Sequence, residues 1–206
     1  MTEETVWVST ALHEAELMSF HWLEPENPSS EVLQGGARPN LRGESLPAEV
    51  FPTALYWKAG HKRKRALPMV FEGEGWVIVR EDFAEIWRQH DAGAGNIYPV
   101  KLFQNNKKTL IEGSYYCLNF GQAKSVIDVE QSNVTTHKGI LVDTHRPEYD
   151  AQPGDIVVSA AALGGPDIWV DPSVRGAFFV SEAMRNAFHA AKLDRALHLT
   201  PCRLLP

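Results

Sequence analysis

The chain has 206 residues, of which 44% are hydrophobic and 22% are charged, so its composition is that of a globular protein and not of a disordered one. A chain of this length can bury a sizeable core, and two cysteines are too few for the disulfide framework of a small secreted protein. No apolar stretch approaches the roughly 18 residues of a membrane span, and the N-terminus lacks the pattern of a secretion signal, so we expect a cytoplasmic protein that does not enter a membrane.

The net charge of −6 is unevenly distributed along the chain. Residues 1–37 contain seven glutamates and no Lys or Arg, and residues 128–171 contain eight carboxylates against two basic side chains. The basic run 61–65 has no interleaved aromatic residues and no groove-reading helix beside it, which is typical of a solvated loop. An acidic surface repels nucleic acid and attracts cationic partners, so we expect a partner with a basic surface and no nucleic acid.

The N-terminal part shows weak periodicity. Residues 5–8 have the pattern of a short strand, and apolar residues then recur at helical spacing. These residues are Ala11, Ala15, Met18 and Trp22. From Glu24 to Pro52 the chain carries five of its thirteen prolines and three glycines, which predicts a loop without a long regular element. A loop of this length inside a compact domain tends to be functional or mobile.

An internal repeat is the most informative pattern in the sequence. Residues 75–87, GWVIVREDFAEIW, align without gaps with residues 176–188, GAFFVSEAMRNAF. Each copy begins with Gly and an apolar, strand-like run, and then places apolar residues at i, i+3 and i+4, on one face of a helix. These residues are Phe83, Ile86 and Trp87 in the first copy and Met184, Ala187 and Phe188 in the second. We predict that Trp87 and Phe188 are buried at equivalent positions against a sheet.

The repeat also predicts where its helices begin and end. Ser181 is a good N-cap for the second helix, and Glu81 and Glu182 fall in the first turns, where the helix dipole favours a negative charge. The segment Asp91–Gly95 ends the first helix, and the repeat resumes as PVKL from Pro99 and PCRL from Pro201. Each unit is therefore predicted to be a strand, a helix and a second strand.

Residues 114–120 alternate as a strand in a sheet does. Tyr115, Cys117 and Asn119 would face one side, and Tyr116, Leu118 and Phe120 the other. Further strands are expected at 139–142, 155–158 and 168–170. The sequence thus predicts one α+β domain over 1–206, with a mixed or antiparallel sheet and a few short helices. Its parts would be an N-terminal segment and loop (1–53), the first unit (66–103), central strands and loops (104–174) and the second unit (175–206).

The familiar patterns of catalytic and metal sites are absent from the sequence. His13-Glu14 lacks the second histidine of a zinc-protease helix, and Asp143 and His145, two apart on an extended segment, do not aim at a common point. Neither a nucleophile elbow, a phosphate loop nor a zinc-type cysteine pair occurs, and Cys117 and Cys202 are predicted to be small buried hydrophobes. We therefore expect a protein that is not an enzyme, with no catalytic residue, cofactor or metal.

Residues that could contact a partner come from two groups. Three tryptophans lie beside Pro-rich or Gly-rich stretches, where an aromatic side chain can anchor an interface. Three carboxylates of the second acidic region could attract a cationic surface. The candidates are Trp22, Trp57, Trp169, Asp143, Glu148 and Asp150.

A series of short motifs has the order found in a known family. These motifs are Leu67-Pro68, Val79-Arg80-Glu81, Tyr98-Pro99-Val100, Tyr116-Cys117-Leu118-Asn119, Phe179-Val180-Ser181-Glu182 and Thr200-Pro201. Together they resemble a family of bacterial immunity proteins of polymorphic toxin systems, over about 66–132 and 168–206. Arg80 departs from the family pattern, which has Ser there, so the first helix lacks the cap that the second one keeps.

The resemblance implies a protein that binds and neutralises a cognate toxin made by the same cell. Two other classes of function stay open at this stage. One is an enzyme whose site is assembled from scattered residues around Asp143, His145 and Asp150. The other is a regulator that binds a small molecule between the two repeated units. Convergent polar groups with a strongly shifted pKa would favour the enzyme, whereas an acidic face with exposed aromatics would favour the binding protein.

Overall fold

The computed structural model describes residues 4–13, 17–18, 20–22, 30–58, 67–139 and 142–205. Most of the regular structure consists of strands, joined by short helices, which confirms the predicted α+β fold with mixed sheets. Among the described residues, no helix combines the length and apolar character needed to cross a membrane.

The larger sheet contains the first predicted unit. Its strands are β2 (Leu17–Met18), β3 (Phe20–Trp22), β4 (Ala54–Trp57), β5 (Val70–Gly73), β6 (Trp76–Arg80), β7 (Asn96–Phe103) and β8 (Tyr115–Asn119), in the order β2-β5-β6-β8-β7-β4-β3. Helix α2 (Glu81–Trp87) connects β6 to β7, and β8 lies between these two strands, antiparallel to both. The first unit is therefore a strand–helix–strand unit split by an inserted strand.

The second sheet contains the second predicted unit. Its strands are β12 (Ile168–Trp169), β13 (Phe178–Ser181), β1 (Val6–Ser9) and β14 (Leu199–Pro201), in that order. Helices α3 (Glu182–Ala190) and α4 (Asp194–Leu197) connect β13 to β14. Strand β1 lies between the strands β13 and β14 and is antiparallel to both. The N-terminal strand thus takes the place that β8 takes in the first unit.

The remaining elements surround these two sheets. They are α1 (Ser30–Leu41), the 3-10 helices η1 (Ala48–Val50) and η2 (Ala160–Leu163), a hairpin of β9 (Val134–His137) and β10 (Thr144–Pro147), and a parallel pair of β11 (Val157–Ser159) and β15 (Arg203–Leu205). The prediction of a strand at 139–142 is wrong for Gly139 and Val142, which lie outside the strands, near the tip of the hairpin. Residues 140–141 lie outside the described part. The strands predicted at 155–158 and 168–170 correspond to β11 and β12, shifted or shortened by one or two residues.

The two units agree down to the pairing of individual residues. Pro99 lies opposite Tyr116 in the first unit, and its counterpart Pro201 lies opposite Trp7 in the second. The aligned glycines Gly75 and Gly176 both have φ in the left-handed region, at 82° and 73°. Glycine adopts this conformation without steric cost, which explains why both copies begin with it.

A polar contact is repeated in the same way. The first helical residue of each unit, Glu81 or Glu182, accepts a hydrogen bond from the polar group of the aromatic residue on the inserted strand. The donors are the hydroxyl of Tyr116 and, at 2.6 Å, Nε1 of Trp7. An arginine lies over each ring. Arg88, directly after α2, is 4.9 Å from the centroid in one unit, and Arg185 of α3 is 4.2 Å from it in the other. Tyr116 and Trp7 lie outside the aligned segments, so the sequence repeat does not reveal this contact.

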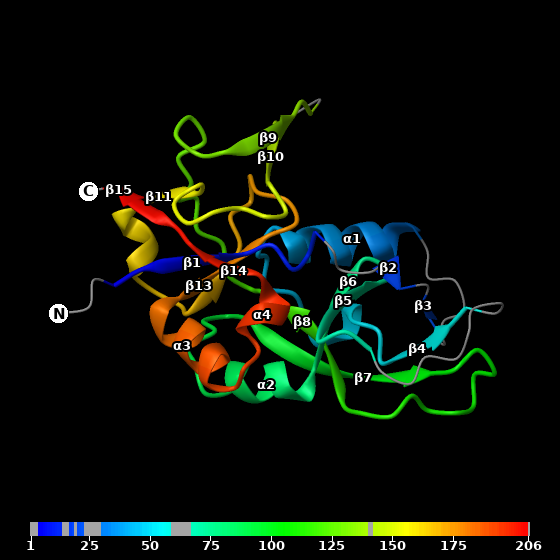
Figure 1. Ribbon diagram of the computed structural model, residues 1–206. Coiled ribbons are helices and arrows are strands. Elements are labelled where there is room, and N and C mark those ends of the chain that lie inside the picture. Colours follow the sequence, from blue (N-terminus) through cyan, green and yellow to red (C-terminus); the bar gives the residue numbers. More distant parts are fainter. Residues whose placement is uncertain are drawn as a thin grey trace.

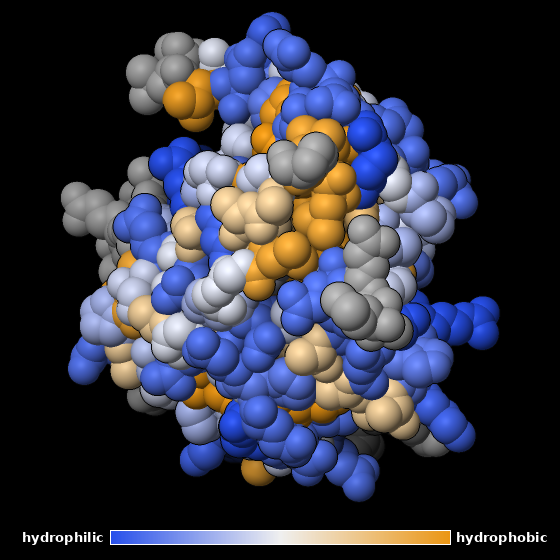
Figure 2. Space-filling view, turned by 90° about the vertical axis from the view of Figure 1, so that its left-hand side faces the viewer, coloured by the Kyte–Doolittle hydropathy of each residue, from blue (hydrophilic) through white to orange (hydrophobic). Residues whose placement is uncertain are grey.

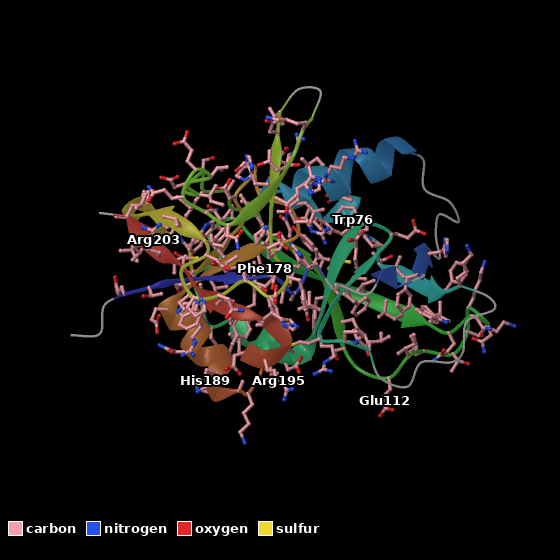
Figure 3. The ribbon with its side chains drawn as sticks, turned by 45° about the horizontal axis from the view of Figure 1, so that its top comes forward. Trp76, Glu112, Phe178, His189, Arg195 and Arg203 are labelled. Atoms are coloured by element: carbon pink, nitrogen blue, oxygen red, sulfur yellow. The ribbon has the colours of Figure 1, made fainter. Side chains whose placement is uncertain are left out.

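The two sheets face each other across a shared hydrophobic core, in which α2 and α3 pack together (Figure 1). Val77 and Val79 of the first unit point into this core, as do their counterparts Phe178 and Val180. The other face of the larger sheet buries Trp76 and Ile78 against α1 and η1, and the other face of the second sheet covers a third cluster that contains Phe179. Figure 3 shows Trp76 and Phe178 inside the molecule and Glu112, His189 and Arg195 at its edge.

Burial confirms the predicted helix faces. Trp87 is 5% exposed and Phe188 is fully buried, and the Phe188 ring lies 5.2 Å from that of Phe83 across the contact between α2 and α3. The predicted alternation along β8 is also confirmed. Tyr115 and Cys117 belong to the cluster on one face of the sheet, whereas Leu118 and Phe120 belong to the shared core on the other.

The prediction that 24–52 lacks a long regular element is wrong, because α1 spans twelve residues. Tertiary contacts override its poor helix propensity. A Cβ at Gly36 would lie 2.5 Å from Cη2 of Trp76, so the glycine allows the helix to approach the sheet closely. Asn40, fully buried, donates from Nδ2 to the carbonyl of Leu118 (2.8 Å) and accepts from Nδ2 of Asn119 (2.8 Å).

The helical spacing from Ala11 to Trp22 also predicted the wrong structure, because residues 17–18 and 20–22 are strands. Residues 14–16 and 19 lie outside the described part. Strand β3 pairs with β4, and Phe20 is buried against the edge of the Trp57 ring, with centroids 5.2 Å apart. Short apolar segments fit the periodicity of a helix and that of a strand equally well, and here pairing with the sheet makes these residues strands.

The two helix starts differ in capping, as the sequence predicts. Oγ of Ser181 accepts from the backbone N–H of Met184 (3.2 Å), whereas Arg80 makes no side-chain cap. Arg80 instead pairs with both carboxylate oxygens of Asp82.

Replacing Ser181 with Ala is expected to lower the free energy of unfolding by about 1 kcal/mol, because the N–H of Met184 loses its acceptor and Oδ1 of Asp167 loses the hydroxyl that donates to it. Urea denaturation with a global fit would measure this loss. Ser159→Ala is the matched control, because Ser159 precedes η2 without capping it. An equal loss in both variants would show that the effect is not capping.

Candidate partner-binding surface

A two-stranded arm projects from the molecule beside α1 (Figure 1). We define the arm as residues 134–150, of which 140–141 lie outside the described part. Strands β9 and β10 form its stem, and Val142 near the tip is 63% exposed. Little of the arm is buried, so it is free to meet another molecule.

Several contacts hold the base of the arm against the second unit. Nε of Arg146 donates to Nε2 of His13 (3.3 Å), and burial and the Arg146 charge both lower the pKa of His13. Thr10 Oγ1 donates to the carbonyl of Tyr149 (3.0 Å), and the Tyr149 hydroxyl lies 3.3 Å from Nε2 of His198. The arm therefore has a defined position relative to the sheets.

The three candidate carboxylates, Asp143, Glu148 and Asp150, all lie on the arm. Asp143 accepts from Nζ of Lys138 (2.6 Å) and from the N–H of Gly139, and these bonds lower its pKa. Glu148 is exposed and accepts from Oγ1 of Thr135 (3.0 Å), and Asp150 is exposed as well. Three carboxylates that the sequence places along one acidic segment thus lie together on the projecting arm. Most of the acidic residues of 1–37, and the basic run 61–65, lie outside the described residues or have undescribed side chains.

The three candidate tryptophans do not gather there. Trp169 is fully buried, stacks on Phe179 and lies beneath Nζ of Lys124, at 3.5 Å from the ring centroid. Trp57 is 4% exposed and packs in the cluster behind the larger sheet. The backbone of Trp22 belongs to β3, and its side chain lies outside the described part. Trp57 and Trp169 are core residues here, so their replacement would first test folding.

An exposed aromatic side chain does lie on the arm. Tyr149 is 37% exposed between Glu148 and Asp150. Neighbouring Pro and Gly residues did not point to Tyr149, although a tyrosine flanked by two carboxylates is itself a signal of an exposed aromatic side chain. Tyr149 is therefore an aromatic candidate for a contact in addition to Trp22.

Apolar surface also lies near the arm. The view of the face with η2 and β15 shows an apolar patch in the upper half of the molecule, with mainly hydrophilic surface at its sides and below it (Figure 2). Within η2 on this face, Ala160, Ala161 and Leu163 are exposed, Leu163 by 41%. An apolar patch rimmed by polar residues is a common feature of a protein-binding face.

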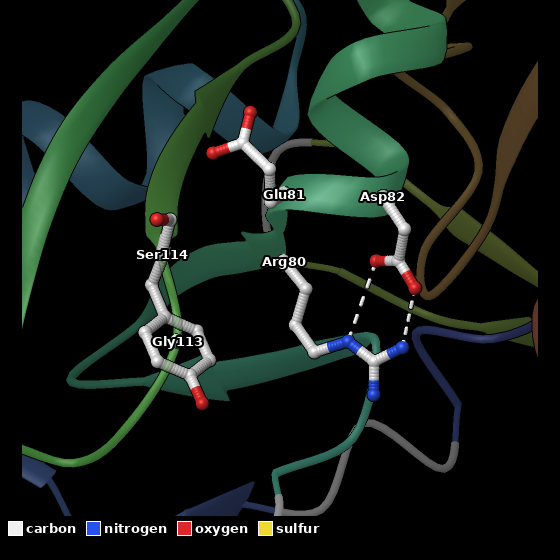
Figure 4. A pocket seen from close by; sticks show the side chains of 6 residues that line it. Arg80, Glu81, Asp82, Gly113 and Ser114 are labelled. Atoms are coloured by element: carbon white, nitrogen blue, oxygen red, sulfur yellow. Dashed lines mark hydrogen bonds and ion pairs between the residues drawn. The ribbon is translucent and has the colours of Figure 1, made fainter.

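A pocket of about 250 Å³ lies at the junction of β6 and α2 (Figure 4). Its charged groups Arg80, Glu81 and Asp82 all have partners within or beside the pocket. Arg80 pairs with Asp82 and donates to the carbonyl of Leu67 (3.3 Å), while Glu81 binds Tyr116 and Arg88. Hydrogen bonding to Asp82 raises the pKa of Arg80 and bonding to Tyr116 lowers that of Glu81, so both stay ionised as a structural network.

The residues considered for an assembled active site each have other hydrogen-bond partners. His145 is paired through Nδ1 with Oγ1 of Thr136 (3.1 Å), Asp143 is held by Lys138, and the carbonyl of Asp150 accepts from Gln152. Among the described residues, no group of three or more His, Cys, Asp or Glu side chains is placed to hold a metal ion. The space between the two repeated units, where a small molecule was considered, is filled by the shared core.

These features define an α+β protein built from two matched split units, with a charged projecting arm as its most prominent exposed element. The model of the Imm11 immunity protein family matches residues 37–199. Since this match covers well over half of the sequence, the chain belongs to the Imm11 immunity protein family, as its motifs predict. No curated protein matches the chain. The match extends further toward the N-terminus than the motifs did, because it includes the end of α1.

Proposed function

We propose that this protein binds one cognate toxin of a polymorphic toxin system in the cytoplasm and neutralises it by covering the toxin's functional surface. The observation that carries the proposal is the projecting arm, on which Glu148, Tyr149 and Asp150 are exposed side by side. Membership of an immunity family supports a toxin as the partner. A non-enzymatic mode of action agrees with the pairing of Asp143 with Lys138 and of His145 with Thr136.

The charge of the arm supports a basic contact surface on the toxin. Carboxylates on an exposed projection create a negative field that speeds the encounter with a cationic surface. Exposed Tyr149 and Val142 supply apolar area on the same arm, and Leu163 on η2 adds exposed apolar surface elsewhere. Aromatic and aliphatic anchors carry most of the affinity in protein interfaces.

The proposal is tested by expressing the toxin domain encoded beside this gene in bacterial cells, with and without this chain. We expect the chain to restore growth and to elute with the toxin domain as one complex in size-exclusion chromatography. A toxin domain from an unrelated system serves as the control and stays lethal. Rescue without a complex would favour the enzymatic alternative, and failure of both rescue and binding would contradict the proposal.

A further inference from the structure

The backbone of β10 shows which edge of the arm is already occupied. The N–H of His145 donates to the carbonyl of Ser173, and the carbonyl of His145 accepts from the N–H of Arg175, both at 2.8 Å. The N–H and C=O of one strand residue point to the same side. His145 therefore directs both groups away from β9, toward residues 173–175.

The opposite edge of the arm follows from this pairing. Thr136 of β9 lies directly across from His145. Since His145 bonds outward, the pair is of the non-hydrogen-bonded kind, and the N–H and C=O of Thr136 also point outward, away from β10. Among the described residues β9 pairs with no strand except β10, and the N–H of its first residue, Val134, is satisfied by the carbonyl of Ser132 (3.1 Å). The open edge is thus centred on Thr136.

The surroundings of this edge leave room for another chain. Thr135, Thr136 and His137 are exposed, and the arm stands away from the sheets (Figure 1). Native proteins usually cover or distort an exposed strand edge, because it is a template for pairing with another strand. An edge left open on a projecting arm is suited to strand addition.

We propose that the open edge of β9 accepts an extended strand of the toxin, which continues the arm through backbone hydrogen bonds to Thr136. This inference rests on the proposed function and specifies how that partner binds. Charge argues for a toxin strand rich in Lys or Arg. The segment 128–150 carries five carboxylates and two basic residues, so a second copy of this chain would bring one acidic segment against another. The carboxylates are Asp128, Glu130, Asp143, Glu148 and Asp150.

The side chains of the added strand would meet different residues on the two faces of the arm. Thr135 donates to Glu148 on one face, whereas Thr136 and His145 contact each other on the opposite face. Alternate side chains of a strand point to opposite faces. Basic residues at every second position of the toxin strand would therefore lie on the Glu148 face.

The test compares Thr136→Pro with Thr136→Ala. Both variants lose the contact with His145, but only proline removes the outward N–H. That N–H takes no part in the β9–β10 ladder, and proline is tolerated at such positions of edge strands. We expect Thr136→Pro to weaken binding of the toxin domain at least tenfold in calorimetry, and Thr136→Ala to change it less than about threefold. Equal affinities of the two variants would overturn strand addition.

A second measurement tests strand addition in the wild-type protein, so its result does not depend on whether the proline variant folds. In the wild-type protein, hydrogen exchange at the Thr136 amide should slow at least tenfold when the toxin domain binds. Unchanged exchange in a formed complex overturns strand addition and leaves the proposed function standing. Slow exchange at Thr136 in a dimer of this chain alone would assign the edge to a second copy. Absence of any complex with the wild-type protein contradicts the proposed function itself.

Discussion

Replacing Phe188 with Ala is expected to lower the free energy of unfolding by about 3–5 kcal/mol, the cost of truncating a buried aromatic residue. Phe188 is fully buried in the core that both units share, where it contacts Phe83 of the other helix. Relaxation around the lost ring would have to move α2 and α3 together, so the cavity cannot collapse locally. Urea denaturation measures the loss.

Two comparisons separate a packing effect from a general one. Glu85→Ala, at an exposed position of α2, should change the free energy of unfolding by less than about 0.5 kcal/mol. In a double-mutant cycle, Phe83 and Phe188 should show a coupling free energy of about 0.5–1.5 kcal/mol, as neighbouring aromatic rings do. A loss below about 1 kcal/mol for Phe188→Ala, or additive single effects, would contradict direct packing of the two units.

Neutralising the arm as Asp143→Asn, Glu148→Gln and Asp150→Asn is expected to slow association with the toxin domain about tenfold at low salt. Long-range attraction sets the rate of encounter, whereas short-range contacts set dissociation, so the dissociation rate should change less. Raising the salt concentration screens the field and should narrow the difference between variant and wild type. Surface plasmon resonance at two salt concentrations gives both rates.

The matched control is a triple variant that loses three negative charges outside the arm. Glu49, Glu85 and Glu112 are exposed and lie on η1, α2 and the loop before β8, and Figure 3 places Glu112 at the edge opposite the arm. Their replacement by Gln should slow association much less than the arm variant. If both triple variants slow it equally, net charge and not the arm attracts the toxin. If neither does, the carboxylates serve solubility alone.

Local patterns in the sequence were sufficient for the repeated units. The buried faces of α2 and α3, the cap at Ser181 and the alternation along β8 follow from the spacing of apolar residues, because each depends on neighbours within one element. The paired glycines, Gly75 and Gly176, carry a backbone requirement that any fold with this turn must meet. The motifs that resembled an immunity family depend on the same elements, and the family match agrees with them.

Helix α1 shows where local reasoning fails. Its proline, Pro39, and its glycines argue against a helix, yet Gly36 is what allows the close approach to Trp76, and Asn40 is bound by partners about 80 residues away. Propensity costs of roughly 1 kcal/mol for each glycine and about 3 kcal/mol for the proline are outweighed by such contacts. The buried tryptophans illustrate the same limit, since neighbouring prolines and glycines do not report which sheet covers a side chain.

The sequence by itself determined the two strand–helix–strand units and the family, because periodic burial and turn residues are written into short stretches of chain. Only the tertiary structure decided that β1, from the far end of the chain, completes the second unit as β8 completes the first. It also decided that Asp143, Glu148 and Asp150 share a projecting arm with an open edge at Thr136. Both depend on pairings between distant segments, which follow from the free energy of the whole packed molecule and not from any local pattern.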